Sequence, residues 1–151
     1  MGKIACRWVL VSRSILPLGA DIHCVMCNRA VETSDHLLVG CNKAWVLWSA
    51  VVNWWGLSWV CPCNVNSLMP GWFGSNYKKF ERYIWEALFC SVVWNIWLTR
   101  NGVIFEQKEH DFQNLFISIL SQAACWVKAD SSMHFDINDF IFHIDQVRKL
   151  K

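Results

Sequence analysis

Apolar residues recur along most of the chain at helical spacing. Residues 44–55 carry an apolar stripe on one face, and residues 77–97 carry rows of apolar residues four positions apart. Residues 111–128 and 136–149 repeat this periodicity, whereas the alternation typical of strands is scarce. The pattern therefore predicts a mainly α fold, with a bundle of three to four helices.

Residues at the boundaries of these segments are suited to helix ends. Asn42 is placed to cap the first helix, and Gly56 follows its end, where a left-handed residue is favoured. Asp111 is placed in the same way to cap the helix over residues 111–128. These residues support the expected helices independently of the apolar pattern.

Two segments are expected to contribute strongly to the core. Residues 88–98 are apolar on nearly every side, which predicts a helix buried at the centre of the fold. Residues 56–76 are rich in Pro, Gly, Asn and Ser and are expected to form a connecting loop. Trp59 and Trp72 in this loop are expected to pack back on the core.

Composition makes this chain apolar for its length of 151 residues. Hydrophobic residues make up 54% and charged residues 17%, and the 11 tryptophans far exceed ordinary usage. The length is sufficient for one hydrophobic core. The formal net charge of +2 is too small to indicate nucleic-acid binding by itself. We expect a piece of a larger protein or a domain that requires a partner.

Membrane insertion and secretion are both disfavoured. Residues 44–63 lack charge over the length of a spanning helix, but Asn53, Gly56 and Pro62 interrupt them. Five of these residues are tryptophans, which prefer the membrane interface to its centre. The N-terminus has the small residues of a signal peptide, but Arg13 breaks its apolar run. Reduced cysteines and an intracellular location, in the nucleus or cytoplasm, are expected.

Candidate chemistry is concentrated in residues 24–41. Cys24 and Cys27 enclose two residues, a spacing that lets both thiolates reach one ion. His36 and Cys41 complete a set of three sulfurs and one nitrogen, which zinc accepts tetrahedrally. Because four protein ligands leave no position for water, the expected site is structural. The alternative is three core cysteines beside an unrelated histidine.

The remaining cysteines and histidines form weaker patterns. Cys61 and Cys63 provide half of a second metal site, but no matching pair follows them. His110, His134 and His143 lie near acidic residues but lack a nucleophile or a ligand spacing, so solvated or capping roles are expected. A glycine-rich phosphate loop is absent from the sequence.

Two segments resemble one family. CVMCNRAVETSDHLLVGCNKAWVLW, residues 24–48, resembles the zinc-binding domain near the C-terminal end of plant LINE-type (non-LTR) retrotransposon reverse transcriptases. VVWNIWLTRNGVIFEQK, residues 92–108, is similar to the segment that follows this domain, and the resemblance extends over residues 11–108. The matching positions are Glu32, Thr33, His36, Leu37, Cys41 and Trp48, and then Trp94, Trp97, Arg100, Asn101, Ile104 and Phe105.

The resemblance implies a non-catalytic zinc-binding module of a retrotransposon polyprotein that assists nucleic-acid binding. It implies a zinc-binding domain over residues 11–60, a linker loop over 61–76 and a helical C-terminal region over 77–151. A basic segment that usually precedes the cysteine pair is largely missing, so a fragment is expected. The parent polyprotein would be an RNA-directed DNA polymerase, but this chain lacks the paired aspartates that hold its two metal ions. We therefore expect it not to be an enzyme.

The expected partners are RNA or DNA and a neighbouring polymerase domain, rather than a small-molecule substrate or a membrane. The basic residues expected to face nucleic acid are Arg29, Lys43, Lys78, Lys79 and Arg82. This hypothesis assumes that the helix carrying the last three lies beside the zinc loop. The alternative function is a protein-interaction or structural helical module with an exposed Trp-rich surface, including a retroelement remnant without function.

Overall fold

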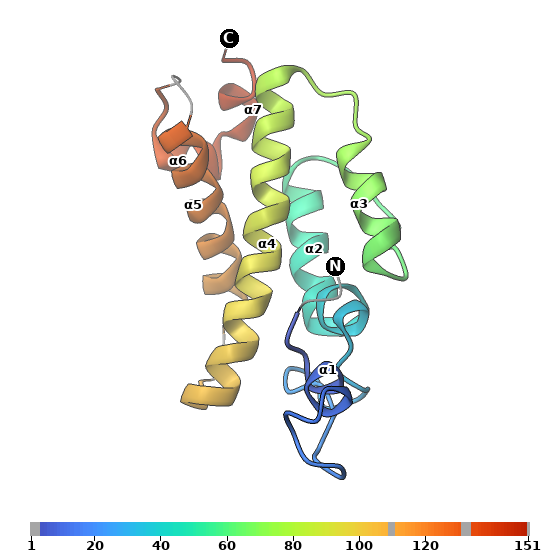
Figure 1. Ribbon diagram of the computed structural model, residues 1–151. Helices are drawn as coiled ribbons and strands as arrows, with labels where there is room; N and C mark the ends of the chain where they lie inside the picture. Colours follow the sequence, from blue (N-terminus) through green and yellow to red (C-terminus); the bar gives the residue numbers. More distant parts are fainter. Residues whose placement is uncertain (1–3, 109–110, 131–133, 151) are drawn as a thin grey trace.

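The computed structural model describes residues 4–108, 111–130 and 134–150, and this part of the chain is mainly helical, as predicted (Figure 1). Within it there is no β-strand, and one isolated bridge joins His23 and Val31. The helices are α1 (Arg7–Ser12), the π-helix η1 (His36–Gly40), α2 (Asn42–Trp54), α3 (Val65–Phe73), α4 (Lys79–Glu106), α5 (Phe112–Asp130), α6 (Ile137–Phe142) and α7 (Ile144–Val147).

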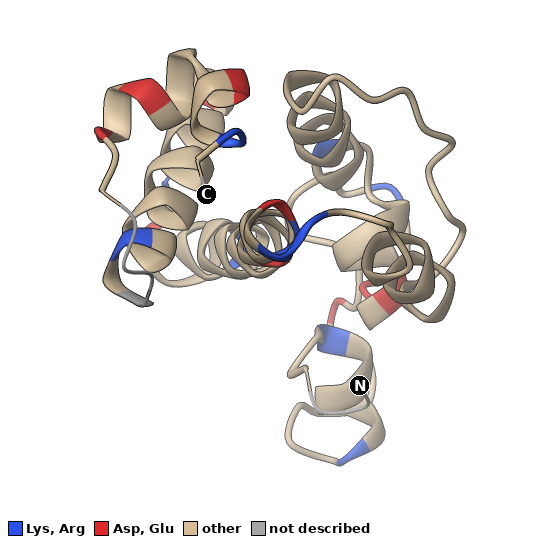
Figure 2. Ribbon diagram, turned by 90° about the horizontal axis from the view of Figure 1, so that it is seen from above, with Lys and Arg blue, Asp and Glu red and all other residues tan. Residues whose placement is uncertain are grey.

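Helix α4 is the central element of the fold. It contacts α2, α3, α5 and η1, and seen from above it lies between α5–α7 on one side and α2–α3 on the other (Figure 2). Residues 88–98 lie in this central helix, as predicted, but one of its faces is open, because Trp94 and Leu98 are each 45% exposed. The opposite face packs Leu88, Val92 and Ile96 into the core.

Judged by length and composition alone, α4 is the only described helix that could span a membrane. Half of its apolar window is buried inside the fold, and the core helix of a soluble protein passes the same test. The uncharged run over residues 44–63 does not form one helix, because α2 ends at Trp54 after 13 residues. This run is therefore too short in helical form to cross a bilayer.

Several helix boundaries differ from the sequence-based expectations. Asn42 is the first residue of α2 and not its cap, because Cys41 has the extended backbone of the N-cap position. Gly56 has a φ of +86°, as expected after the helix end, and the Asp111 carboxylate accepts the Gln113 N–H at 3.0 Å. The last predicted helix is two short ones, because His143 leaves the helical conformation between α6 and α7.

The expected linker loop over residues 61–76 contains helix α3, so that expectation is wrong for residues 65–73. The Asn64 side chain caps α3 by accepting the Ser67 N–H at 2.9 Å. Val65, Leu68 and Trp72 are buried at helical spacing, a short amphipathic pattern that the Pro and Gly content of the segment obscured. The division of the chain into three domains stays a prediction.

Tryptophan side chains join α3 to the rest of the core. Trp72 and Trp85 stack with ring centroids 3.9 Å apart, and each indole N–H donates to the backbone carbonyl of the other residue, at 2.8 and 2.9 Å. Trp48 contacts Trp72, and Trp59 packs on both of them. The inward packing of Trp59 and Trp72 predicted from the sequence is thus confirmed. The exposed tryptophans of the described chain are Trp8, Trp45, Trp94 and Trp126.

Candidate metal centre

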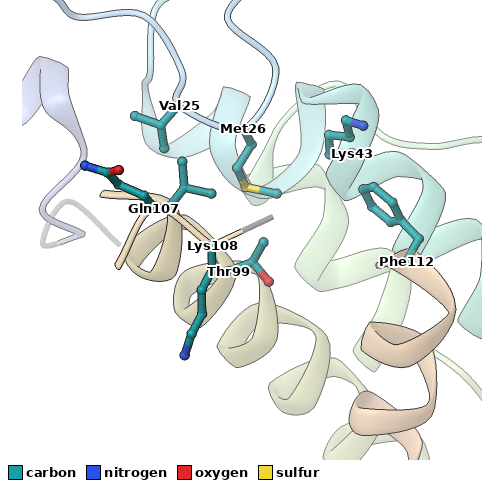
Figure 3. Close-up of a pocket in the computed structure, with 8 residues that line it drawn as sticks. Val25, Met26, Lys43, Thr99, Gln107, Lys108 and Phe112 are labelled. Carbon is teal, nitrogen blue, oxygen red and sulfur yellow. The ribbon is translucent and has the colours of Figure 1, made fainter. Parts of the chain in front are cut away.

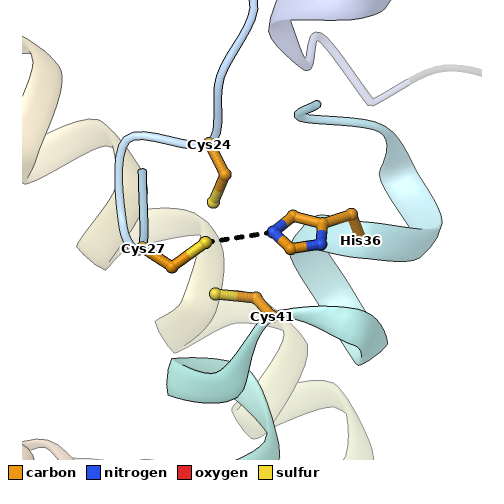
Figure 4. Close-up of side chains that lie close together, drawn as sticks. All are labelled: Cys24, Cys27, His36 and Cys41. Atoms are coloured by element: carbon orange, nitrogen blue, oxygen red, sulfur yellow. Dashed lines mark hydrogen bonds between the residues drawn. The ribbon is translucent and has the colours of Figure 1, made fainter. Parts of the chain in front are cut away.

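The structure brings Cys24, Cys27, His36 and Cys41 together into a cluster that can hold a metal ion (Figure 4). Their potential ligand atoms all lie within 4.8 Å of one another. The Cys27 Sγ and the His36 Nε2 are 3.3 Å apart. Within the described ranges, this is the only group of three or more His, Cys, Asp or Glu residues whose ligand atoms lie close enough together to hold one metal ion.

A tight turn brings the first two thiols to the centre. The Asn28 N–H donates to the Cys24 carbonyl at 2.7 Å, and the Cys24 N–H donates to the Ala30 carbonyl at 2.8 Å. Asn28 has a φ of +52°, a left-handed conformation that asparagine tolerates better than most residues. The chain therefore reverses within a few residues after Cys27, and both cysteine side chains face His36 (Figure 4).

A π-helical turn positions the other two residues. The Cys41 N–H donates to the His36 carbonyl at 2.6 Å, which is the five-residue hydrogen bond of a π-helix. In an α-helix, residues five apart are rotated by about 140° from each other, so they would point in different directions. The wider turn brings the His36 imidazole and the Cys41 thiol to the same side. The sequence-based prediction found these ligands but not this conformation.

Neighbouring side chains hold the π-turn in place. The Thr33 hydroxyl accepts the His36 N–H at 3.0 Å, and the Trp48 indole donates to the Leu38 carbonyl at 2.7 Å. The Asp35 carboxylate accepts the Val65 N–H at 3.0 Å, which attaches the first residue of α3 to the same turn. The cluster is thus connected by hydrogen bonds to both α2 and α3.

The electrostatic environment favours a thiolate at Cys41. The pKa of the Cys41 thiol is lowered to about 5, chiefly by the hydrogen bond with Cys24 and also by the backbone N–H groups of Lys43 and Ala44 at the start of α2, which together outweigh the effect of burial. The same contact raises the pKa of the Cys24 thiol, with burial adding to the increase. Cys24 and Cys41 are fully buried, whereas Cys27 and His36 are half-buried. Cys41 is therefore the thiol of this pair that ionises first.

A buried ion pair connects the cysteine loop, which comprises residues 24–36, to α4. The Arg100 Nη2 lies 2.8 Å from the Glu32 Oε1, and these side chains are 5% and 0% exposed. The same Glu32 oxygen accepts the backbone N–H of Arg7 at 2.8 Å, and Arg100 also donates to the Ala5 carbonyl at 3.2 Å. Three segments distant in sequence, the N-terminal residues, the loop and α4, therefore meet at one carboxylate.

The structure does not bring the five predicted nucleic-acid residues together. Arg29 is exposed in the cysteine loop, and Lys43 lies over the Phe112 ring at 4.8 Å from its centroid. The exposed residues Lys78, Lys79 and Arg82 lie at the opposite end of α4 from Arg100. From Arg82 to Arg100 the helix rises by about 27 Å. The assumption that Lys78, Lys79 and Arg82 lie beside the cysteine loop is therefore wrong.

The weaker candidates form no site among the residues that the structure describes. Cys61 is half-buried and Cys63 exposed, and neither belongs to a potential metal cluster. His134 and His143 are both exposed. His110 lies outside the described residues.

Comparison with family models, curated proteins and solved structures found no match. The family resemblance of the two sequence segments therefore stays a hypothesis.

Proposed function

We propose that this chain is a zinc-binding module that holds single-stranded RNA or DNA, and that it derives from a retrotransposon reverse transcriptase. The observation that carries the proposal is the convergence of Cys24, Cys27, His36 and Cys41 within 4.8 Å. No catalytic step is assigned to the chain. The role of the metal is to fix the cysteine loop by joining Cys24 and Cys27 to His36 and Cys41.

Zinc is the metal that this ligand set favours. Three thiolates and one imidazole suit a tetrahedral Zn²⁺ site, and four protein ligands leave no open position. The ionised Cys41 supplies one negative ligand before metal binding, and Zn²⁺ displaces the protons of the other thiols. The site therefore has the donor set of a structural zinc centre.

Support for the retrotransposon origin comes from the position of the two resembling segments. Glu32 belongs to the first segment and Arg100 to the second, and their side chains form the buried ion pair although the residues are 68 positions apart in sequence. A buried charge is costly unless its oppositely charged partner is also present. This pairing gives a physical reason for Glu32 and Arg100 to occur together in one chain.

Metal analysis tests the first half of the proposal. We expect one zinc per chain in purified protein, and we expect Cys27→Ser to lose it. Cys63→Ser is the matched control, because Cys63 is exposed and outside the cluster. Protein without bound zinc, or equal zinc content in Cys27→Ser and wild type, would contradict the assignment.

Binding of a labelled single-stranded RNA pentamer tests the second half. Arg29 and Lys43 are the predicted phosphate contacts at the metal end, so Arg29→Gln with Lys43→Gln should weaken binding. Two phosphate contacts give a logarithmic salt slope of about 1.4. The Lys78→Gln, Lys79→Gln and Arg82→Gln triple variant should leave pentamer binding unchanged, because these residues lie at the far end of α4. No measurable RNA or DNA binding by the zinc-loaded protein would refute the nucleic-acid role.

One observation favours the alternative of a protein-interaction module. An apolar groove of about 700 Å³ lies between the N-terminal residues and α4 and α5, and Trp94, Trp97 and Trp126 line it. Trp94 and Trp126 are exposed, and large exposed apolar patches commonly mark contact surfaces. Sedimentation of the zinc-loaded protein distinguishes the cases. Self-association that Trp94→Ser abolishes, without RNA binding, would favour the interaction module.

A further inference from the structure

A pocket of about 590 Å³ lies directly beside the cysteine loop (Figure 3). Val25 and Met26, the two residues enclosed by Cys24 and Cys27, form one wall. The pocket lies where four elements meet, namely the cysteine loop, the first turn of α2, the C-terminal part of α4 and the start of α5. Its lining residues are Val25, Met26, Lys43, Thr99, Val103, Gln107, Lys108 and Phe112.

Thr99 provides the pocket with a polar group that has no partner. Its side chain extends from α4 toward the space between α4 and α5, and the residue is only 5% exposed (Figure 3). Its hydroxyl makes no hydrogen bond to any described residue. A buried hydroxyl without a partner carries a desolvation penalty. The Thr99 oxygen has almost no accessible surface, so a ligand reaches it only after rotation about χ1, for which a helical threonine has two favourable rotamers.

The other walls are mainly apolar, with positive charge at the margin. Met26, Val103 and Phe112 provide the apolar part of the lining. The Lys43 ammonium group lies over one face of the Phe112 ring, 4.8 Å from its centroid. Lys108 also borders the pocket, but its charge is paired with Glu106. Lys43 is therefore the cation best placed for an anionic group of a ligand.

We propose that this pocket binds one unpaired nucleobase of a single-stranded RNA or DNA, with the adjoining phosphate at Lys43. The inference rests on the proposed nucleic-acid role and identifies the site. A base has flat apolar faces for Phe112 and Met26, and its polar edge can bond to the Thr99 hydroxyl once χ1 rotation turns that group into the pocket. The volume falls within the range of small-molecule sites.

Simpler ligands fit this combination of groups less well. An inorganic anion would leave the apolar walls uncovered, and an apolar ligand would leave the Thr99 hydroxyl without a partner. A double-stranded helix cannot present its base edges and faces to a pocket of this kind without unpairing. The single-stranded form is therefore the expected ligand.

Two substitutions test the pocket with zinc-loaded protein and fluorescein-labelled pentauridine RNA. Thr99→Val keeps the shape but removes the hydroxyl, and the loss of one hydrogen bond should weaken binding roughly fivefold. Phe112→Leu removes a stacking surface and should weaken binding roughly tenfold, at high as well as low salt. Phe142→Leu is the control, because Phe142 is 68% exposed and lies in α6, far from the pocket.

Folding is monitored separately by circular dichroism and zinc content. Thr99→Val should not lower the melting temperature, because it removes an unpartnered hydroxyl from the interior. A pentamer with an abasic central position should bind wild type more weakly than pentauridine, and Thr99→Val should reduce that difference. Photocrosslinking of a central 5-iodouridine to Met26 or Phe112 would support the assignment directly.

The outcomes separate this inference from the proposed function. If pentauridine binds, Arg29→Gln with Lys43→Gln weakens it, and Thr99→Val and Phe112→Leu bind as wild type does, the base pocket is refuted while the nucleic-acid role stands. If the wild-type protein binds neither RNA nor single-stranded DNA, both proposals fail. Selective weakening by both pocket variants, with Phe142→Leu unchanged, supports the pocket.

Discussion

Replacing Arg100 with methionine tests whether the Glu32–Arg100 pair holds the cysteine loop on α4. Methionine keeps much of the length and apolar stem of arginine but removes both hydrogen bonds to the Glu32 Oε1, at 2.8 and 3.2 Å. The Glu32 carboxylate, which is 0% exposed, then keeps only backbone donors: the Arg7 N–H at 2.8 Å and a weaker contact from the Val25 N–H at 3.5 Å.

Breaking a buried ion pair by removing one partner costs about 3–5 kcal/mol. A domain of ordinary stability has about 5–15 kcal/mol in total, so Arg100→Met should remove a large share of it. The charge left behind causes most of this loss. Adding Glu32→Gln to Arg100→Met should therefore restore about 1–3 kcal/mol, although each single substitution is destabilising.

Urea unfolding of the four proteins of this double-mutant cycle, followed by circular dichroism with saturating zinc, measures both values. Zinc affinity of the single variants should fall as well, because Glu32 lies in the loop between Cys27 and His36. Removal of one partner of a buried ion pair should cost at least about 3 kcal/mol, so a loss of unfolding free energy below about 1 kcal/mol in Arg100→Met would refute the reasoning. A double variant no more stable than Arg100→Met would do so too.

Three further predictions follow from other contacts. Asn64→Ala removes the side-chain cap of α3 and should lower the free energy of unfolding by about 1 kcal/mol, measured with urea. Asn66→Ala should cost less, because Asn66 is exposed within α3 and does not cap it. Arg148→Gln should cost about 1–2 kcal/mol, because the Arg148 guanidinium pairs with Glu81 at 3.0 Å and lies 4.3 Å from the Trp55 ring centroid, and it should leave zinc affinity unchanged. In the folded, metal-free protein the pKa of the Cys41 thiol lies near 5, compared with 9.0 for the unfolded chain. Ionisation of this thiol therefore stabilises the fold increasingly as the pH rises from 5 toward 9, and this contribution is lost as the pH falls through 5. Thiolate absorbance should show this step near pH 5 in wild type and lack it in Cys41→Ser; a first step near pH 9 would contradict it.

Sequence patterns were most successful where a single local rule decided the outcome. The long amphipathic segments, the Asp111 cap and the left-handed Gly56 each depend on residues close in sequence, and the structure confirms them. Helix α3 was missed because Pro70 and Gly71 are strong loop formers. The Asn64 cap, the burial of one face of α3 and the stacking of Trp72 on Trp85 outweigh that preference. Contacts between distant segments cannot be derived from local spacing.

The candidate site shows the same division. The order and spacing of Cys24, Cys27, His36 and Cys41 were sufficient to predict that these four side chains converge on one point. The separation of the basic residues was not predictable, because it depends on the direction in which α4 runs relative to the cysteine loop. The unpartnered Thr99 hydroxyl gave no sequence signal either, since a threonine within a long apolar helix is usually unremarkable.

The π-turn between His36 and Cys41 also limits how related chains can differ in length. An α-turn brings residues four apart to the same side, and the π-turn does so for residues five apart, so either interval preserves the arrangement of the two ligands. A larger insertion or deletion would rotate one ligand away. By contrast, the polar segment between Cys27 and His36 lies outside any helix until Ser34, and surface loops accept insertions at little cost. Searches for distant relatives should therefore let that segment vary freely while allowing the His-to-Cys interval to change by one residue only.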